Sequence, residues 1–335
     1  MNNTLSKITF RGKTILVTGC AGFIGWKVSQ LLLEMNKHVI GVDNINDYYD
    51  PALKQWRLKT LKTYPGFSFY KVDISDYKKL KKIFLENKID AVINLAARAG
   101  VRASVEDPWV YLDTNTKGTL NLLECCKDHK VKKFVLASTS SLYASLDMPF
   151  KETSKTDTPL APYSATKKGA EALCHAYHYL YGIDITVLRY FTVYGPAGRP
   201  DMSIFKFVKN MDAGRPIPLF GDGTQTRDFT YIDDIADGTI RALKPLGYEI
   251  INLGSDHPVK LNYVIGLLEK HLGIKAKIKR FKLHPADVTA TWANIDKAEK
   301  MLGWKPKMSL EQGIENTVRW FLDNKKFLKS LKWKD

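Results

Sequence analysis

The amino-acid sequence predicts an α/β fold: a Rossmann-type doubly wound parallel sheet with a smaller, mixed C-terminal substrate lobe. Three observations lead to this prediction. A short apolar run near the N-terminus is followed by a glycine-rich turn and then by apolar residues at helical spacing. Strand-like and helical runs then alternate up to residue 190, which is typical of a parallel sheet covered on both faces. Beyond residue 190 the pattern breaks into stretches rich in glycine and proline.

The first βαβ unit is expected in residues 14–42. Thr14–Thr18 is a short apolar run, Phe23–Met35 has helical apolar spacing, and His38–Val42 is a second β-rich run. Further strands are expected at Ser68–Val72, Ala91–Leu95, Phe134–Ser138 and Ile185–Arg189. Helices are expected between them at Tyr77–Asn87, Thr114–His129 and Tyr163–Tyr181. Such an order favours parallel strands joined by helical crossovers.

The second lobe is expected to start in the glycine- and proline-rich stretches Gly195–Pro200 and Gly214–Gly223. We predict a Rossmann domain in residues 1–190, to which residues 225–258 return. Residues 191–224 and 259–335 form the predicted substrate-binding lobe. That lobe would lie over the carboxyl edge of the sheet, where open α/β sheets bind ligands.

Composition limits the possible classes of protein. The 335 residues suffice for a large core, and no apolar run approaches the ~18 residues of a membrane-spanning helix. With no apolar signal core in Met1–Phe10, we expect a cytoplasmic protein without an integral membrane segment. The four cysteines have neither metal-ligand nor disulfide-framework spacing, so reduced thiols and no metal site are expected.

The net charge of +16 favours anionic partners but does not choose among them. Much of the excess lies in lysine runs such as Lys78–Lys82, which are typical of solvated helix faces. No nucleic-acid motif accompanies these lysines, so a nucleic-acid partner is not expected.

A dinucleotide site is predicted where the first strand meets the first helix. Gly19, Gly22 and Gly25 have the spacing G-x-x-G-x-x-G and would let the backbone approach a pyrophosphate at the helix N-terminus. Asp43 ends the second strand, where a carboxylate can bind the adenosine ribose and repel a 2′-phosphate. This favours NAD over NADP, although Asp43 in Asp-Asn also suits a turn. Asp73 and Ile74 follow the third strand and could face the adenine, or simply end the strand.

Tyr163 and Lys167 are the predicted catalytic pair. They are four residues apart in a helix and so project from one face. A free tyrosine has a pKa of about 10, but a lysine ammonium, a positive nicotinamide ring and a helix N-terminus can lower it. A Tyr-x-x-x-Lys spacing also arises by chance on protein surfaces. Here it follows the glycine loop and the hydroxyl-rich strand end Ser138–Ser141, which favours catalysis.

The sequence resembles the extended short-chain dehydrogenase/reductase family over nearly its whole length. The resemblance is carried by the glycine loop, Asn94–Ala97, Asn115, Ser138–Ser141, Tyr163–Lys167 and Arg227–Asp234. Within that family it is most similar to the UDP-glucuronate 4-epimerases, through Asp43–Asp50, Phe191–Pro196 and Gly198–Met202. This implies an NAD-dependent enzyme that acts on a UDP-sugar as a homodimer.

The resemblance also implies roles for individual residues. Tyr163 would take the proton of the sugar 4-hydroxyl while the C4 hydride passes to NAD, and the hydride would return to the other face of the 4-keto sugar. Thr139 would bind the reacting oxygen, or else satisfy the local backbone. The implied cofactor contacts are Gly19, Gly22, Phe23, Ile24, Gly25, Asp43, Asn44, Asp73, Ile74, Leu95, Ala96, Ala97, Asn115, Tyr163 and Lys167.

For the substrate, the resemblance implies that Arg227 binds the diphosphate, Asp287 contacts the uridine ribose and Arg199 lies near the sugar or supports a turn. Family dehydratases and decarboxylases carry acids after the hydroxyl residue, where this chain has Ser140 and Ser141. We therefore expect an epimerase that holds the substrate carboxylate with hydroxyls, and the candidates are Thr139, Ser140, Ser141 and Thr192.

The sequence departs from the epimerase pattern at Arg98, Ala144, Ala197 and His284. Arg98 and Ala197 leave other substrates open, namely UDP-glucose, UDP-galactose or their N-acetyl forms. A net NAD(P)-dependent sugar-nucleotide reductase is a further alternative. A non-catalytic nucleotide sensor or RNA-binding relative is another, against which the intact Tyr163 and Lys167 argue.

Overall fold

The computed structural model describes residues 10–144, 146–282, 288 and 290–333 of the chain. Its main feature is a parallel seven-stranded sheet in the order β10-β6-β5-β4-β1-β2-β3. The strands are β1 (Thr14–Thr18), β2 (His38–Asp43), β3 (Phe67–Lys71), β4 (Ala91–Asn94), β5 (Lys133–Thr139), β6 (Asp184–Tyr190) and β10 (Tyr248–Leu253). The order reverses at β1, between β2 and β4, as in doubly wound sheets. The predicted Rossmann-type fold is therefore confirmed.

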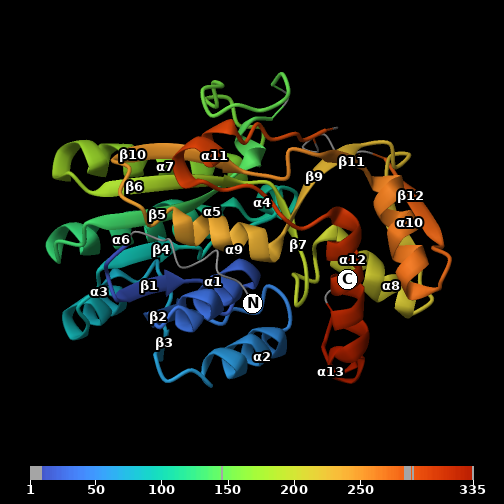
Figure 1. Cartoon of the computed structure of the whole chain (residues 1–335), viewed down its shortest axis with the longest axis horizontal. Coiled ribbons are helices and arrows are strands. Elements are labelled where there is room, and N and C mark those ends of the chain that lie inside the picture. The colour runs from blue at the N-terminus through green and yellow to red at the C-terminus, as the bar shows by residue number, and fades with distance from the viewer. Residues whose placement is uncertain (1–9, 145, 283–287, 289, 334–335) are drawn as a thin grey trace.

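Helices cover both faces of this sheet (Figure 1). One face carries α1 (Phe23–Glu34) and α9 (Ile232–Arg241), which pack against each other. The other carries α3 (Tyr77–Glu86), α6 (Gly118–Asp128) and α7 (Pro162–Tyr181). The remaining helices of this domain are α2 (Pro51–Leu61), α4 (Ala103–Glu106), α5 (Pro108–Tyr111), the π-helical turn η2 (Leu112–Lys117) and the short 3₁₀ turn η3 (Ser140–Leu142).

The apolar residues of each strand are divided between two cores. Ile15 and Val17 of β1 pack with Val28 of α1, whereas Leu16 packs on the opposite face with Leu122 of α6. All five are fully buried. Successive side chains of a strand point to opposite faces, so a continuous apolar run is what a strand buried on both sides requires.

The second lobe is built around two small sheets. One has the order β11-β9-β7, from β7 (Thr192–Tyr194), β9 (Thr226–Tyr231) and β11 (Pro258–Lys260), and the other pairs β8 (Ile217–Phe220) with β12 (Ile278–Phe281). Its helices are α8 (Ser203–Asp212), α10 (Leu261–Leu272), α12 (Leu310–Asp323) and α13 (Lys325–Lys329), whereas α11 (Asp296–Leu302) contacts β10 and α9 of the large-sheet domain. Figure 1 shows α8, α10 and β12 at one end of the molecule, with β7 and β9 between them and the large sheet. The predicted division of the chain, with residues 1–190 and 225–258 in one lobe and residues 191–224 and 259–335 in the other, stays a prediction.

Two local features differ from the sequence-based expectations. The helix expected at Thr114–His129 consists of η2 followed by α6, and the wide turn places the buried Asn115 amide against the backbone of Arg98. Helix α2 was not expected. It begins at Pro51 after Asp50, whose carboxylate caps it by accepting a hydrogen bond from Ala52 N, and it buries Leu53, Leu58 and Leu61.

Candidate active site

A cavity of about 350 Å³ opens at the carboxyl edge of the large sheet. Most of the predicted site residues line it: Gly19, Gly22, Phe23, Ile24, Gly25, Asp43, Asn44, Asp73, Ile74, Leu95, Ala96, Ala97, Thr139, Ser140, Ser141, Tyr163, Lys167, Thr192 and Arg199. Asn115 and Arg227 are not among its lining residues. Residues from both lobes thus surround one space, as expected for a two-ligand site.

The glycine loop forms a backbone cradle on one side of this cavity. Gly19 has a φ of +67°, and a Cβ atom there would lie 2.8 Å from the backbone nitrogen of Ala96. At Gly25 a Cβ atom would lie 2.1 Å from the carbonyl oxygen of Gly19. Side chains are therefore excluded at both positions, and the loop packs closely where helix α1 begins. This backbone fits the pyrophosphate of a dinucleotide, since helix N-termini favour anions.

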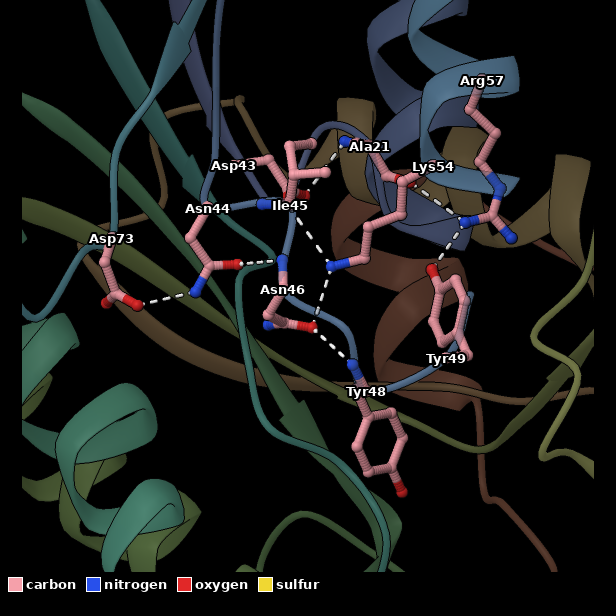
Figure 2. A network of polar contacts seen from close by, with 10 residues as sticks. All are labelled: Ala21, Asp43, Asn44, Ile45, Asn46, Tyr48, Tyr49, Lys54, Arg57 and Asp73. Atoms are coloured by element: carbon pink, nitrogen blue, oxygen red, sulfur yellow. Dashed lines mark hydrogen bonds and ion pairs between the residues drawn. The ribbon is translucent and has the colours of Figure 1, made fainter. Parts of the chain in front are cut away.

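Asp43 lies at the end of β2 and is fixed by several groups (Figure 2). Its carboxylate accepts hydrogen bonds from the backbone nitrogens of Ala21 at 3.2 Å and Ile45 at 2.8 Å. Lys54 of α2 lies 3.5 Å away and also donates to Asn46 Oδ1 at 3.1 Å. Lys54 lines the cavity but was missed in the sequence, although it follows the Asp50-Pro51 signal of a helix start. The arrangement places an acid where an adenosine ribose would lie.

Asp73 is connected to the same region by a hydrogen bond from Asn44 Nδ2 to Asp73 Oδ2 at 2.6 Å. Burial raises the pKa of Asp73, but hydrogen bonds from Ser75 and Asn44 outweigh it and keep the pKa below its ordinary value. Asp73 is therefore ionised at neutral pH. Its two carboxylate oxygens are oriented by Ser75 and Asn44, so it supports Asn44 beside the predicted adenine position.

The predicted contact residues after β4 are held by hydrogen bonds from neighbouring segments. Thr18 Oγ1 accepts hydrogen bonds from the backbone nitrogens of Leu95 and Ala96, at 3.1 and 3.0 Å. The Asn115 amide donates to Arg98 O at 3.0 Å and accepts from Arg98 N at 2.9 Å. Asn115 therefore orients backbone that lines the site, and it also donates to Thr166 Oγ1 at 3.1 Å. A direct cofactor contact by Asn115 stays a prediction.

Tyr163 lies beside Thr139 at the end of β5. Burial raises the pKa of Tyr163, while Thr139 and the positive charge of Arg199 act in the opposite direction. Lys167 instead donates to the carbonyl oxygen of Ala137 at 2.8 Å. Among the described residues, no hydrogen bond joins Lys167 to Tyr163. The cation that acts on the phenol in this structure is thus Arg199, which sequence spacing alone does not indicate.

Lys167 is a buried residue of the cavity lining, and the charge of Glu171 acts on it. Burial lowers the pKa of Lys167 to about 8, and the negative charge of Glu171 partly opposes this. Glu171 is itself buried and forms an ion pair with Arg189 at 2.8 Å. It also accepts a hydrogen bond from Ser138 Oγ at 2.6 Å. Glu171 and Arg189 were missed in the sequence because they meet only when α7 packs on β6.

The predicted hydroxyl cluster lies together in the cavity wall. Thr139 Oγ1 donates to Ser141 Oγ at 3.1 Å and accepts from Ser141 N at 3.1 Å. Ser140 and Thr192 also line the cavity. Hydroxyls can donate to a carboxylate without supplying an acid of their own. This wall can therefore hold an anionic group without protonating it.

Two guanidinium groups lie near the ring of Tyr48, at 4.9 Å for Arg98 and 5.6 Å for Arg199. Arg199 forms an ion pair with Asp201 at 2.6 Å and donates to Ala99 O at 3.3 Å. Arg98 Nη1 is buried and has no hydrogen-bond partner within the described part of the chain. This wall therefore carries a net positive charge and an unused donor, which suits an anionic ligand.

Arg227 and Asp287 are the residues predicted to bind the uridine diphosphate, and Arg227 is not among the residues that line the cavity. Arg227 in β9 donates to the carbonyl oxygens of Thr226 at 2.8 Å and Val288 at 2.7 Å. Asp287 and His284 lie outside the described residues. The roles of Arg227 and Asp287 therefore stay predictions.

The described residues contain neither a metal-binding cluster nor a membrane-spanning helix. No three His, Cys, Asp or Glu side chains in this part of the chain come together in a way that could hold a metal ion. None of its helices combines the length and hydropathy needed to span a bilayer.

The chain is similar to known proteins along most of its length. Residues 15–254 match the model of the NAD dependent epimerase/dehydratase family. A UDP-glucuronate 4-epimerase of Thermodesulfobacterium geofontis (strain OPF15) is 60% identical over 318 residues, which are 95% of this chain and 98% of that protein. UDP-glucuronate 4-epimerase 4 of Arabidopsis thaliana is 42% identical over 334 residues, with 94% of this chain and 76% of that protein covered.

A solved structure shares the fold. The crystal structure of UDP-glucuronic acid 4-epimerase from Bacillus cereus, in complex with UDP-glucuronic acid and NAD, matches with a TM-score of 0.88. The two sequences are 40% identical, and the match covers 92% of this chain and 99% of that one.

Proposed function

This chain belongs to the NAD-dependent epimerase/dehydratase family, and we propose that it is an NAD-dependent enzyme that converts UDP-glucuronate to UDP-galacturonate by inverting C4. One observation carries the proposal: Tyr163, Thr139 and the hydroxyls of Ser140 and Ser141 share a cavity with the glycine cradle and Asp43. A proton acceptor, carboxylate ligands and a dinucleotide site thus meet in one space. When bound, NAD supplies a reversible acceptor for the C4 hydride.

The acid–base step belongs to Tyr163. Its phenol oxygen takes the proton of the sugar 4-hydroxyl. It returns the proton after the 4-keto sugar has rotated in the cavity and presents its other face. Thr139 lies beside Tyr163 and would bind the same sugar oxygen. The positive charge of Arg199 favours the phenolate form. Lys167, fixed by Ala137 O, lines the same floor and would orient the bound cofactor.

The substrate carboxylate would be held by hydroxyl donors. A glucuronate oxidised at C4 is a β-keto acid and loses carbon dioxide readily once its carboxylate is free. Thr139, Ser140, Ser141 and Thr192 line the cavity, and positions 140 and 141 hold no side-chain acid. These hydroxyls would keep the carboxylate anionic and immobile. Arg227 and Asp287 would bind the uridine diphosphate.

The test is the product spectrum of the purified protein. Incubation with UDP-glucuronate should give UDP-galacturonate as the main product by NMR, with no steady change in nicotinamide absorbance. Mainly UDP-pentose, net reduction of NAD, or turnover of UDP-glucose but not UDP-glucuronate would each contradict the proposal.

A homodimer is proposed from the exposed apolar residues of neighbouring helices. Trp109 of α5 is 73% exposed and Tyr179 of α7 is 81% exposed, and α5, η2 and α7 contact one another. Leu112 and Leu180 add to this surface. Large exposed apolar patches mark interaction sites. Light scattering on a size-exclusion column should give twice the mass of the 38.0 kDa chain.

We also propose that the protein works in the cytoplasm. All four cysteines are buried as free thiols, which agrees with a reducing compartment. Cell fractionation with an antibody against the chain would test this location.

A further inference from the structure

Arg57 of helix α2 is a buried charge that the proposed reaction does not use. Its exposed fraction is 0%. No carboxylate of the described residues lies within 4.0 Å of its guanidinium, so no ion pair neutralises it. Burying an unpaired guanidinium is costly unless hydrogen bonds replace its hydration. The groups that supply those bonds therefore indicate what the residue does.

The guanidinium joins three segments that are far apart in the sequence. Nη1 donates to Ala21 O at 3.0 Å and to the Tyr49 hydroxyl at 2.7 Å, as Figure 2 shows. Nη2 donates to Ala197 O at 2.7 Å and Gly198 O at 3.2 Å. Ala21 belongs to the glycine loop, and Ala197 and Gly198 directly precede Arg199. Each of these segments contributes residues to the cavity wall.

The loop that contains Ala197 needs such support. Ala197 is fully buried and has a φ of +54°, in the left-handed region that a residue with a Cβ atom rarely adopts. Its carbonyl oxygen faces Arg57, and two residues later Arg199 acts on the phenol of Tyr163. The same guanidinium thus fixes the unfavourable backbone on the sugar side and the carbonyl of Ala21 on the cofactor side.

We propose that Arg57 is a positioning residue that couples the two ligand sites, so that occupation of the glycine loop by NAD strengthens binding of the sugar nucleotide. The substrate side of this inference rests on the proposed function. The coupling is reciprocal, because linkage requires that each ligand changes the affinity of the other by the same factor. Arg57 touches neither ligand and acts only through Ala21, Ala197 and Gly198.

The test compares Arg57→Lys with the wild-type holoenzyme. A lysine keeps the charge but lacks the two-pronged head that reaches both Ala21 and Ala197. We expect the KM for UDP-glucuronate to rise by about tenfold or more, with kcat per NAD-loaded site changed by less than about threefold. The factor by which UDP, used as a non-reacting probe, slows the release of NAD should fall to near one.

Arg241→Lys is the matched control. Arg241 also donates to two backbone carbonyls, those of Leu302 at 3.4 Å and Gly303 at 3.2 Å at the C-terminal end of α11, but it does not line the cavity. That variant should keep the wild-type KM and the wild-type effect of UDP. If Arg57→Lys lowers the melting temperature but leaves both quantities within about twofold, Arg57 is only structural and the proposal is wrong.

A second measurement covers the case in which Arg57→Lys does not fold. Amide hydrogen exchange of the wild-type protein should slow in residues 195–199 when NAD is added, and in residues 19–22 when UDP is added. Exchange that changes only at the segment nearest each ligand would overturn the proposal. A wild-type protein that couples NAD with UDP but does not turn over UDP-glucuronate would refute the proposed function and not the role of Arg57.

Discussion

The ammonium of Lys54 lies 3.5 Å from the carboxylate of Asp43, and the two side chains are only 7% and 6% exposed. Asp43 is the acid expected to bind the adenosine ribose and to repel a 2′-phosphate. In the structure it is neutralised by a cation that also lines the cavity. The choice between NAD and NADP at this site therefore depends on a balance between two opposite charges.

Removing the acid should leave the cation facing the ribose. Asp43→Ala is expected to raise the ratio of kcat/KM for NADP over NAD by at least about tenfold, which corresponds to about 1.4 kcal/mol. Measurements after removal of bound cofactor would give this ratio. In the double variant Asp43→Ala with Lys54→Met the gain should disappear. Unchanged selectivity in Asp43→Ala would mean that Asp43 serves only the turn at Ile45.

Tyr163→Phe removes the proton acceptor and keeps the ring. We expect kcat to fall by about 10²–10⁴-fold, because only the general base is lost. Binding of NAD and of UDP should stay close to wild type by calorimetry. Activity within about tenfold of wild type would show that another group takes the proton.

Arg199 should set the pH at which Tyr163 becomes active. A phenol must lose its proton before it can take one from the sugar, and a neighbouring cation lowers its pKa. Arg199→Met removes that cation, so the pKa of Tyr163 rises and the ascending limb of kcat against pH moves to higher pH. Arg98→Met is the control, because Arg98 is not among the groups that shift the pKa of Tyr163. Equal shifts in both variants would contradict this account.

Loss of one hydroxyl from the cavity wall should release carbon dioxide from the intermediate. Thr192→Ala or Ser141→Ala removes one donor to the substrate carboxylate, and a hydrogen bond to a charged group contributes about 1.5–3 kcal/mol. We expect a larger fraction of UDP-pentose, followed by mass spectrometry, while oxidation at C4 persists. Thr63→Ala, an exposed site outside the cavity, should leave the product ratio unchanged. A wild-type ratio in both cavity variants would mean that these hydroxyls do not hold the carboxylate.

The buried pair Arg189–Glu171 should contribute to stability. The side chains of Arg189 and Glu171 are 1% and 2% exposed. Glu171→Gln therefore leaves a buried guanidinium without its counter-charge. Breaking such a pair costs about 3–5 kcal/mol, which urea unfolding would measure. The exposed pair Arg319–Glu315 is the comparison, and Glu315→Gln should cost less than about 1 kcal/mol. A loss in Glu171→Gln as small as that would show that the buried pair contributes little.

Local sequence patterns were sufficient for strands β1 to β6 of the large sheet and for the cofactor loop. Thr14–Thr18 is a buried strand as predicted, and Gly19 has the positive φ that explains why a glycine stands there. These features depend on residues within one βαβ unit, where spacing and side-chain size decide the backbone. The predicted roles of Arg227 and Asp287 came from resemblance, and the geometry of the described residues does not test them.

The sequence by itself determined the class of fold, the glycine cradle and the residue types of the catalytic pair, because each is specified by neighbours in the chain. Only the tertiary structure decided which charges meet. Arg57 donates to a carbonyl 36 residues away and to another 140 residues away. The charge of Arg199 acts to lower the pKa of Tyr163, whereas Lys167 donates to Ala137 O. These residues are far apart in the sequence and come together only where segments of both lobes meet at the edge of the sheet. A local pattern of residues therefore cannot predict that they pair.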